Sequence, residues 1–505
     1  MRLFNTLLFV LFALSANAAD GTVGTVSVQK GNNVSVNGEA PLSLTLDGKD
    51  HQSCQFLSKR APDENHEFTW KEVTTTRGGE LAEILGDQLR SVDSLVVKGN
   101  VNDKDFHAMW DASLYGYLSV INLKNAVLEN NAVPDTAFFH ENEQYEGSSH
   151  EIFYYIGLRK IILPEGLEKI GEGAFYQASA LRQVNFPSTL RYIGDFAFNA
   201  TKLEMNQLVI PEGVEEINQY AFAFCRKLKA QVILPSAIKK IGEWAFYGCP
   251  ITSINLPEGL ESLGSLAFWD CDLREVSIPS SCHEFNEGWQ FGFNRNLEKM
   301  HLPEGMTEIP DHFAVDCFRL REVNFPHTLK HIGEKAFSLC ISLKNVELPL
   351  GMQSLGEEAF SELEALEQIV FPASMKSLGK NSCSYWKNIK RIYCAAMEPP
   401  VCDPTDGGVF SGFDFPDGFD TPVVYIPKGT INKYKDTSRN CMGWEKFWNY
   451  VEIDPSEFPT TAIDSPAIVE TQSKDNSFYD LMGRKVEHPQ KGNIYIQHGK
   501  KFVVK

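Results

Sequence analysis

The sequence predicts a repeat solenoid in which short parallel β-strands stack coil upon coil between atypical ends. The first observation is a proline that recurs at steps of 22 to 24 residues. The second is that the residues one and three before each proline are apolar in all ten copies, whereas the residue four before is polar. A period of this length is typical of stacked coils and not of a single globular core. The ten prolines are Pro164, Pro187, Pro211, Pro235, Pro257, Pro279, Pro303, Pro326, Pro349 and Pro372.

The residues before each proline predict one short strand per coil. Apolar and polar residues alternate there with a period of two, as expected for a strand that buries one face. Proline ends the strand because it has no N–H to donate to a ladder. We therefore expect one strand from each coil to join a single parallel sheet.

The residues after each proline predict a turn and a core position. An apolar residue stands six after every proline, and the next residue is Gly seven times and Asn twice, with Pro310 as the exception. Gly and Asn tolerate positive φ, so we expect a left-handed turn at this position. Ala-Phe follows in seven copies, as at Ala245-Phe246. We expect the aromatic ring to fill the coil interior and the small Ala to let neighbouring coils approach.

This pattern, L-x-x-I-x-L-P-x-x-L-x-x-I-G-x-x-A-F-x-x-C, resembles the BspA-like, or treponeme-type, leucine-rich repeat. Leu181 to Phe186, Leu320 to Phe325 and Leu343 to Leu348 carry its strand, and the likeness extends over about 220 residues. The resemblance implies a right-handed, curved leucine-rich repeat stack in an exported protein of Bacteroidetes-like bacteria. The expected location is secreted or on the cell surface in association with the outer membrane, with the periplasm as an alternative. The resemblance also implies binding or adhesion to a protein or glycan, including host matrix or cell surface.

The N-terminal part of the chain divides into three segments. Residues 1–18 read as a signal peptide, with Arg2 before an apolar run and Ala16-Asn17-Ala18 as the cleavage site. Residues 19–78 form a small β-rich segment, rich in Val and Thr with Gly turns. Residues 79–157, with helices expected over 81–89 and 103–110, are interpreted as irregular repeats that cap the main stack at 158–388, because an open end would expose the core.

The C-terminal part is predicted to close the stack and then leave it. Residues 389–454 read as further repeats and a cap, and residues 455–475, rich in Pro, Ser, Thr and Asp, read as a linker. Residues 476–505 alternate as short strands around Gly turns and resemble secretion sorting domains, although the segment is shorter than a full domain. A small β module without a targeting role is the alternative.

Charge and hydropathy argue against nucleic-acid binding and against a membrane-spanning helix. The chain has a net charge of −19 with 43% hydrophobic residues, which is typical of an acidic globular protein. Nucleic acid requires a basic face, and none is visible in the sequence. After the first 18 residues, no stretch reaches the length of a membrane-spanning helix.

Catalytic, cofactor and metal motifs are missing from the sequence. It contains no G-x-S-x-G, H-E-x-x-H, Walker A or dinucleotide-binding pattern, so we assign no catalytic residue, cofactor or metal ligand. Five Asp residues between Asp403 and Asp420 lack the spacing of an EF-hand loop, and a solvated loop is favoured over a calcium site. An enzyme with its site in the N-terminal segment or the 398–420 loop stays an alternative, as does a structural cell-surface component.

Five of the eleven cysteines recur fourteen residues after a proline. Side chains that point the same way in a ladder do not easily reach disulfide geometry, so we expect a reduced packing column. Cys394, Cys402 and Cys441 are the better candidates for a disulfide. The column comprises Cys225, Cys249, Cys271, Cys317 and Cys340.

The outward strand positions supply the candidate binding surface. They lie four and two before each proline and are expected on the concave face. Three apolar residues interrupt a face of Gln, Asn and Lys, and an apolar centre with a polar rim is the anatomy of a recognition patch. The stacked Gln residues have an alternative role as an amide ladder that stabilises the sheet. The predicted ligand-binding residues are Lys160, Ile162, Gln183, Gln207, Val209, Gln231 and Ile233.

Overall fold

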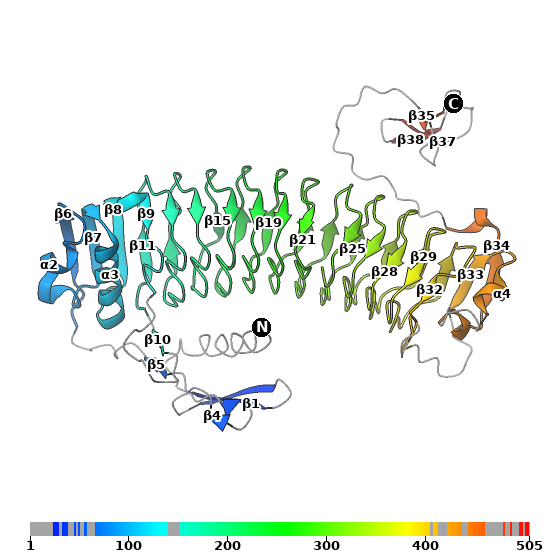
Figure 1. Cartoon of the computed structure of the whole chain (residues 1–505), viewed down its shortest axis with the longest axis horizontal. Coiled ribbons are helices and arrows are strands. Elements are labelled where there is room, and N and C mark those ends of the chain that lie inside the picture. Colours follow the sequence, from blue (N-terminus) through cyan, green and yellow to red (C-terminus); the bar gives the residue numbers. More distant parts are fainter. Residues whose placement is uncertain are drawn as a thin grey trace.

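The computed structural model describes residues 66–139, 156–403, 408–412, 422–436 and 443–459 in full, with the backbone of a few further short strands. The predicted signal peptide at 1–18 and most of the predicted linker at 455–475 lie outside these residues. Figure 1 shows a long, curved stack of coils that runs from β6 at one end to β34 at the other. The predicted repeat solenoid is therefore confirmed.

Each coil of the central stack contributes two short strands, so the prediction that each coil gives one strand to a single parallel sheet was wrong. The first strand lies directly before the proline, as predicted, and the second lies a few residues after it. The first strands are β11 (Lys160–Ile162), β13 (Gln183–Val184), β15 (Gln207–Val209), β17 (Gln231–Ile233), β19 (Ser253–Asn255), β21 (Glu275–Ser277), β23 (Lys299–His301), β25 (Glu322–Asn324), β27 (Asn345–Glu347) and β29 (Gln368–Phe371). The second strands are β12 (Lys169–Ile170), β14 (Tyr192–Ile193), β16 (Glu216–Ile217), β18 (Lys240–Ile241), β20 (Ser262–Leu263), β22 (Glu284–Phe285), β24 (Glu308–Ile309), β26 (His331–Ile332), β28 (Ser354–Leu355) and β30 (Ser377–Leu378).

Both sets of strands pair in parallel and in register, so each repeat position faces the same position of the next coil. Gln207 lies opposite Gln231 in the first-strand sheet, and Ile217 lies opposite Ile241 in the second-strand sheet. The ladders are interrupted in places. Among the described residues, both stop between the coil of β13 and β14 and the coil of β15 and β16.

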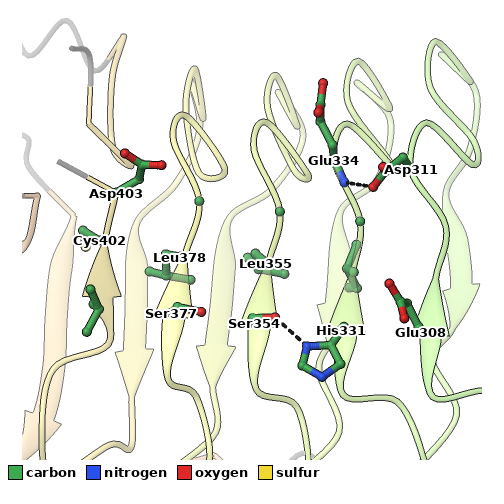
Figure 2. Close-up of a pocket in the computed structure, with 15 residues that line it drawn as sticks. Glu308, Asp311, His331, Glu334, Ser354, Leu355, Ser377, Leu378, Cys402 and Asp403 are labelled. Atoms are coloured by element: carbon green, nitrogen blue, oxygen red, sulfur yellow. Dashed lines mark hydrogen bonds between the residues drawn. The ribbon is translucent and has the colours of Figure 1, made fainter. Parts of the chain in front are cut away.

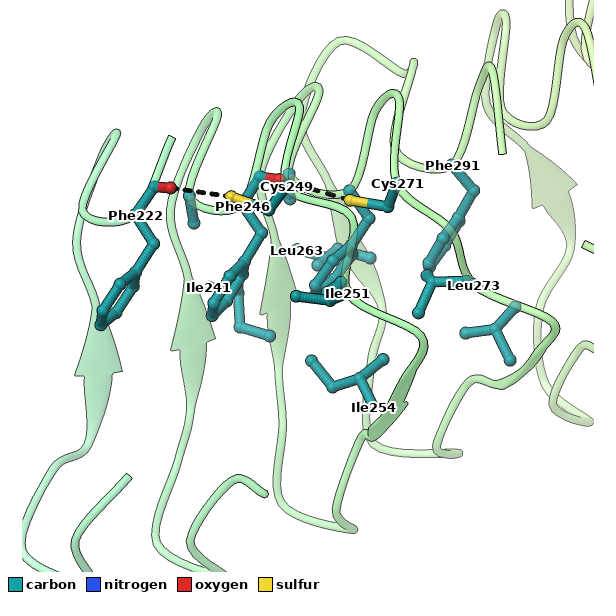
Figure 3. Packing of buried hydrophobic residues seen from close by; sticks show 14 of the residues in the cluster. Phe222, Ile241, Phe246, Cys249, Ile251, Ile254, Leu263, Cys271, Leu273 and Phe291 are labelled. Atoms are coloured by element: carbon teal, nitrogen blue, oxygen red, sulfur yellow. Dashed lines mark hydrogen bonds between the residues drawn. The ribbon is translucent and has the colours of Figure 1, made fainter. Parts of the chain in front are cut away.

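A column of phenylalanine rings fills the interior, as the Ala-Phe pattern predicts. Phe222, Phe246 and Phe268 are fully buried, and the ring of Phe246 stacks on its two neighbours at centroid distances of 5.3 and 5.6 Å. The preceding Ala245 is also fully buried. Figure 3 shows the rings of Phe222 and Phe246 together with Ile241 and Leu263 of the second strands. Burial of such a side chain contributes about 1.5–3 kcal/mol to the free energy of unfolding.

The Gly column after the second strand serves close approach and not a left-handed turn, so that prediction was wrong. A Cβ at Gly242 would come within 2.8 Å of the backbone nitrogen of Gln219 in the neighbouring coil, and one at Gly356 within 2.6 Å of that of Glu334. The left-handed residue comes two positions later, as at Trp244 with φ 57°. The Gly is required because the backbones of adjacent coils meet there.

The predicted cysteine column is reduced and buried. Each thiol donates to a carbonyl of the preceding coil: Cys249 Sγ lies 2.8 Å from the Phe222 oxygen, and Cys271 Sγ lies 3.3 Å from that of Phe246 (Figure 3). Asn294 and Trp386 do the same at equivalent points, donating to Phe268 and Phe360. The column thus links adjacent coils by hydrogen bonds instead of disulfides.

The N-terminal end is built from longer elements than the repeats. These are β6 (Trp70–Thr75), α2 (Leu81–Leu85), the 3₁₀ turn η2 (Gly86–Gln88), β7 (Ser94–Val101), α3 (Asp103–Tyr115), β8 (Val120–Leu128), η3 (Glu129–Asn131) and β9 (Ala132–Val133). Strand β6 pairs with β7 in the sheet that continues into β11, so the ladder begins at Trp70 and not at residue 79.

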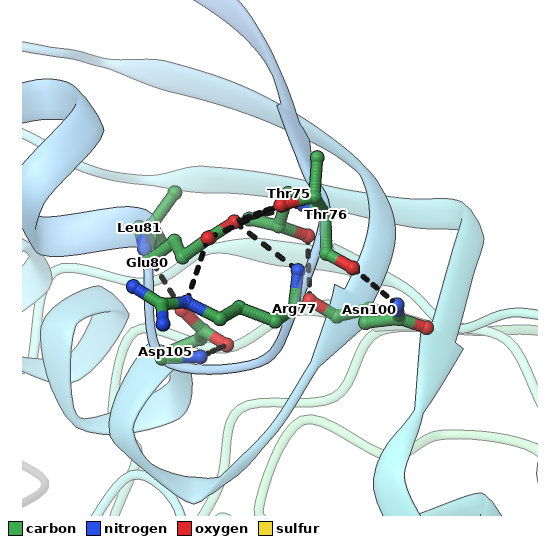
Figure 4. A network of polar contacts seen from close by, with 8 residues as sticks. Thr75, Thr76, Arg77, Glu80, Leu81, Asn100 and Asp105 are labelled. Atoms are coloured by element: carbon green, nitrogen blue, oxygen red, sulfur yellow. Dashed lines mark hydrogen bonds and ion pairs between the residues drawn. The ribbon is translucent and has the colours of Figure 1, made fainter.

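A buried carboxylate joins the two N-terminal helices. Asp105 accepts hydrogen bonds from the backbone N–H groups of Gly79, Leu81 and Asn102 at 2.6, 2.9 and 2.9 Å. Glu80 accepts from Thr76 and Arg77 at the neighbouring turn (Figure 4). These bonds satisfy N–H groups that a helix start leaves without a partner.

The C-terminal end closes with aromatic residues. Its elements are β31 (Arg391–Cys394), β32 (Val401–Cys402), β33 (Val423–Pro427), α4 (Ile431–Tyr434), η4 (Trp444–Lys446), β34 (Tyr450–Ile453) and η5 (Pro455–Glu457). Tyr434 and Trp444 are fully buried, with ring centroids 5.3 Å apart. Cys394, predicted as a disulfide candidate, is an unbridged thiol that accepts from the Tyr434 hydroxyl, while Cys441 lies outside the described residues.

The remaining strands lie outside the fully described ranges. In the N-terminal part they are β1 (Gly24–Gln29), β2 (Asn33–Gly38), β3 (Thr45–Leu46), β4 (Lys49–Asp50), β5 (Gln55–Leu57) and β10 (Ile152–Tyr154). In the predicted tail they are β35 (Phe478–Tyr479), β36 (Lys485–Val486), β37 (Ile494–Gln497) and β38 (Lys500–Val503), which form one antiparallel sheet.

Candidate functional site

The predicted binding residues all lie on the outer side of the first-strand sheet. Val209 is 51% exposed, Ile162 and Ile233 are half-buried, and the polar members are half-buried or exposed. Lys160 lies opposite Gln183, and Gln207 lies opposite Gln231. The two outward columns that the alternation predicts are therefore present.

The structure brings only two of the three apolar residues together. Val209 and Ile233 are direct partners in the ladder. Between Ile162 and Val209 comes Asn185, whose side chain accepts from the Leu163 N–H at 2.7 Å and donates to the Leu163 carbonyl at 3.0 Å. The ladder is also interrupted between β13 and β15. The apolar centre is thus the Val209–Ile233 pair, with Ile162 set apart from it.

An amide contact accompanies this pair. Gln207 Nε2 donates to Gln231 Oε1 at 3.3 Å, which is the ladder arrangement considered as the alternative role for these residues. Both side chains are exposed, so the bond stabilises the sheet by at most about 1 kcal/mol. The contact fixes the orientation of the two amides and leaves their other donors and acceptors toward solvent.

A second apolar region on the same face was missed by the sequence reasoning. Val370, Tyr393 and Tyr425 are ladder partners on β29, β31 and β33. The two Tyr rings stack at 4.4 Å, and burial, followed by the neighbouring Tyr425, raises the pKa of Tyr393. Residues 389–454 were predicted to contain further repeats, and extending the outward column by two coils would have located these rings.

A shallow groove lies on the second-strand face near the C-terminal end (Figure 2). Two successive coils have a short residue at the outward second-strand position here, Ser354 and Ser377, whereas Ser262 in an earlier coil is flanked by Lys240 and Glu284. The floor is formed by the glycines of the close-approach column. Carboxylates surround the groove, namely those of Glu308, Asp311, Glu334 and Asp403.

The groove contains one pair that bears on catalysis. His331 Nδ1 lies 2.6 Å from Ser354 Oγ. An activated serine needs a third group that orients the imidazole. Among the ion pairs of the described residues, none joins His331 to a carboxylate, so the pair lacks the third member of a triad. The described ranges also contain no cluster of three His, Cys, Asp or Glu side chains suited to a metal ion.

Within the described part of the chain, no helix is both long and apolar enough to cross a membrane. The arrangement as a whole is an extended repeat solenoid with several outward faces.

Comparison with known proteins identifies the repeat. Residues 148–233, 229–337 and 311–397 match the BspA type leucine rich repeat region, in six copies. The chain is accordingly a BspA-type leucine-rich repeat protein. No curated protein matches it.

Several solved structures are similar. A leucine-rich repeat protein from Bacteroides ovatus is 19% identical over 74% of this chain and 93% of its own, with a TM-score of 0.41. A leucine rich cell surface protein from Faecalibacterium prausnitzii is 21% identical over 52% and 83%, with a TM-score of 0.31. The pneumococcal vaccine antigen PcpA is 17% identical over 86% and 99%, with a TM-score of 0.35.

Proposed function

We propose that this protein is exported and acts without catalysis, binding a protein or glycan partner at the cell surface through the outward residues of its repeats. Support comes from the contrast between inward and outward positions. The inward columns repeat nearly unchanged, as with the buried Phe198, Phe222 and Phe246. The outward columns change from coil to coil, as with Val209, Asn255 and His301. A stack needs constancy only in its core, which leaves the outer residues available for recognition.

The Val209–Ile233 pair and its neighbours are the proposed contact area on the first-strand face. Apolar side chains on a solvated face have no role in the core, and interfaces place such residues at their centre within a polar rim. Gln207 and Gln231 supply the rim, and Lys160 lies beyond the break in the ladder, beside Ile162. Lys160 belongs to no ion pair among the described residues, so its charge is available to a partner.

Export is proposed from the first 18 residues, which combine Arg2, an apolar run and a small-residue cleavage site. The alternative function, a structural component of the cell surface, differs from this proposal in the partner. A component of a surface layer contacts further copies of itself and not a separate ligand.

The test begins with a screen of the chain without residues 1–18 on protein and glycan arrays. Changing Ile162, Val209 and Ile233 together to Ser should weaken binding of the ligand so identified at least about tenfold, because a central apolar contact is lost. The melting temperature should change little, since these side chains lie outside the core. Surface plasmon resonance and thermal unfolding provide the two measurements.

Asn345 and Glu347, exposed at the same two positions of β27, provide the matched control. Changing both to Ser should leave affinity within about twofold. Unaltered affinity in the folded triple variant would remove the first-strand patch from the proposal, whatever the array ligand proves to be.

A further inference from the structure

A second surface, separate from the first-strand face, lies along the turn that follows the second strand. Aromatic side chains occupy one repeat position there in four of five successive coils, the other coil having Leu266, and further aromatic residues stand three residues later. We name this set the aromatic belt. It consists of Phe196, Tyr220, Trp244, Tyr247, Trp269 and Trp289.

The belt rings contact one another outside the main core. The Tyr220 ring stacks on Phe196 at 4.7 Å and on Trp244 at 5.3 Å. Trp244 also contacts Tyr247 at 4.4 Å, and Trp269 contacts Trp289 at 5.2 Å. All except Tyr247 are half-buried, so each of those five rings presents part of itself to solvent.

The fold does not require aromatic residues at these positions. Trp244 and Trp289 adopt left-handed backbone angles, with φ of 57° and 65°. Lys335, Glu358 and Asn381 occupy the same position in later coils with φ of 51°, 53° and 52°. Asn adopts this conformation more readily than an aromatic residue does. An aromatic side chain there is therefore selected for something other than turn geometry.

Two arginines extend the belt. Arg226 packs over the Phe224 ring at 5.6 Å and pairs with Asp270 at 2.7 Å. Arg295 lies over the rings of Phe293 and Phe318, 5.9 Å from each, and is exposed, with no ion pair among the described residues. Trp, Tyr and Arg are the residues that carry most binding energy in protein interfaces.

The ring orientation separates two kinds of partner. A sugar stacks on an aromatic ring through a free face. In the belt, Phe196 and Trp244 cover both faces of the Tyr220 ring, His312 covers one face of Trp289 at 3.6 Å, and the Trp269 ring lies against Gly292. Because Tyr220 is half-buried with both ring faces covered, its exposed part is the ring edge and the hydroxyl group. Burial raises the pKa of Tyr220 to about 12, so its hydroxyl stays a neutral donor at physiological pH.

We propose that the aromatic belt is a docking surface for a protein partner that packs apolar side chains against the ring edges and places a carboxylate opposite Arg295. This surface is independent of the first-strand patch, because the two occupy different positions of the coil. The test of the aromatic belt is therefore independent of any ligand that the protein and glycan arrays identify for the first-strand patch.

The test uses a random-sequence peptide library displayed on phage, selected against the chain without residues 1–18. The variant changes Tyr220, Trp244 and Trp289 to Asn, the residue that the chain itself places at position 381. We expect selected peptides to carry apolar and acidic side chains and to bind this variant at least about tenfold more weakly. Arg295→Gln should weaken the acidic peptides alone.

The matched control changes Lys335 and Glu358 to Asn and should leave peptide binding unchanged. Thermal unfolding verifies that each variant folds, and Trp244→Asn alone replaces the triple variant should the latter not fold. Peptides that bind the Asn variant as well as the original chain would overturn the proposal. Two other results would also overturn it. If analytical ultracentrifugation showed that the original chain is a dimer and the belt variant a monomer, the belt would be a contact between two copies of this chain. If the belt variant lost binding to a glycan, the partner would be a glycan and not a protein.

Discussion

The coils between residues 158 and 293 and those between 308 and 403 share one interior but differ on the outside. In the first region the turn after the second strand bears Tyr220 and Trp244, and long side chains such as Lys240 cover the second strands. In the second region the same positions hold Lys335 and Glu358, and Ser354 leaves a groove. One backbone thus supports two different surfaces, which teaches that the packing of this stack constrains only its inward columns.

The core rings are buried in both regions, but their relative orientation changes at the boundary. From Phe175 to Phe291 the rings stack nearly parallel, at interplanar angles of 3° to 10°. Phe313 then meets Phe291 edge to face at 76°, and Phe337 and Phe360 are 6.0 Å apart. Trp289 and the buried Gln290 stand at this transition, in the coil whose sequence departs most from the repeat. Both arrangements are favourable for aromatic pairs.

The largest expected effect comes from removing a core ring in each region. Phe246→Ala should lower the free energy of unfolding by about 3–5 kcal/mol, through lost burial and a cavity. Phe337→Ala should do the same within about 1 kcal/mol, since both rings are fully buried and the two regions share the core requirement. Urea unfolding followed by circular dichroism measures both. A cost under about 1 kcal/mol in either variant would contradict the shared interior.

An intermediate effect is expected from the close-approach column. Gly242→Ala and Gly356→Ala place a Cβ 2.8 and 2.6 Å from the neighbouring backbone, so each should cost about 1–3 kcal/mol in the same assay. Gly351→Ala is the matched control, because its Cβ would meet nothing closer than 3.8 Å. The control should be neutral or slightly stabilising. Equal behaviour of the Gly351 and Gly356 variants would contradict the close approach of adjacent backbones at Gly356.

The smallest effect is a loss of stability in alkali, caused by the thiol column. Burial raises the pKa of Cys317 from 9.0 to about 12. Between these pH values only the unfolded chain releases the proton, so the free energy of unfolding falls as pH rises above 9, on the order of 1 kcal/mol by pH 10. Below pH 9 the thiol has no such influence. Cys317→Ala should flatten the pH dependence of the urea midpoint between pH 8 and 10, and an unchanged slope would argue against a buried neutral thiol.

The sequence predicted the stack because its signals repeat ten times. The Pro after each first strand and the Phe of each core column were read correctly for that reason. The second strands, such as Lys169–Ile170, are two residues long, too short for an alternation to show. Gly242 was misread because close approach and positive φ favour the same residue.

The candidate site was predicted only in part, for a related physical reason. The outward columns follow from alternation alone, so Val209 and Ile233 were located. The aromatic belt was not recognised, although Phe196, Tyr220 and Trp244 each directly precede an Ala-Phe pair, because the residue type at that position is not constant from coil to coil. Tyr220 and Trp244 become neighbours only once successive coils stack in register.

The junction where both strand ladders stop also has a consequence under tension. Among the residues that the structure describes, no strand ladder connects the coil of β13 and β14 to that of β15 and β16. These coils are held together by turn hydrogen bonds, such as Phe198 N–H to the Ala221 carbonyl, and by the hydrogen bond that the Asn218 side-chain amide donates to the Ile193 carbonyl. Stacked rings of Phe198 and Phe222 also connect them. A pulling force applied between the two ends of the stack loads every junction in series. The junction with the fewest strand-to-strand hydrogen bonds separates first. We therefore expect the stack to open near residue 200 while the coils on either side stay folded.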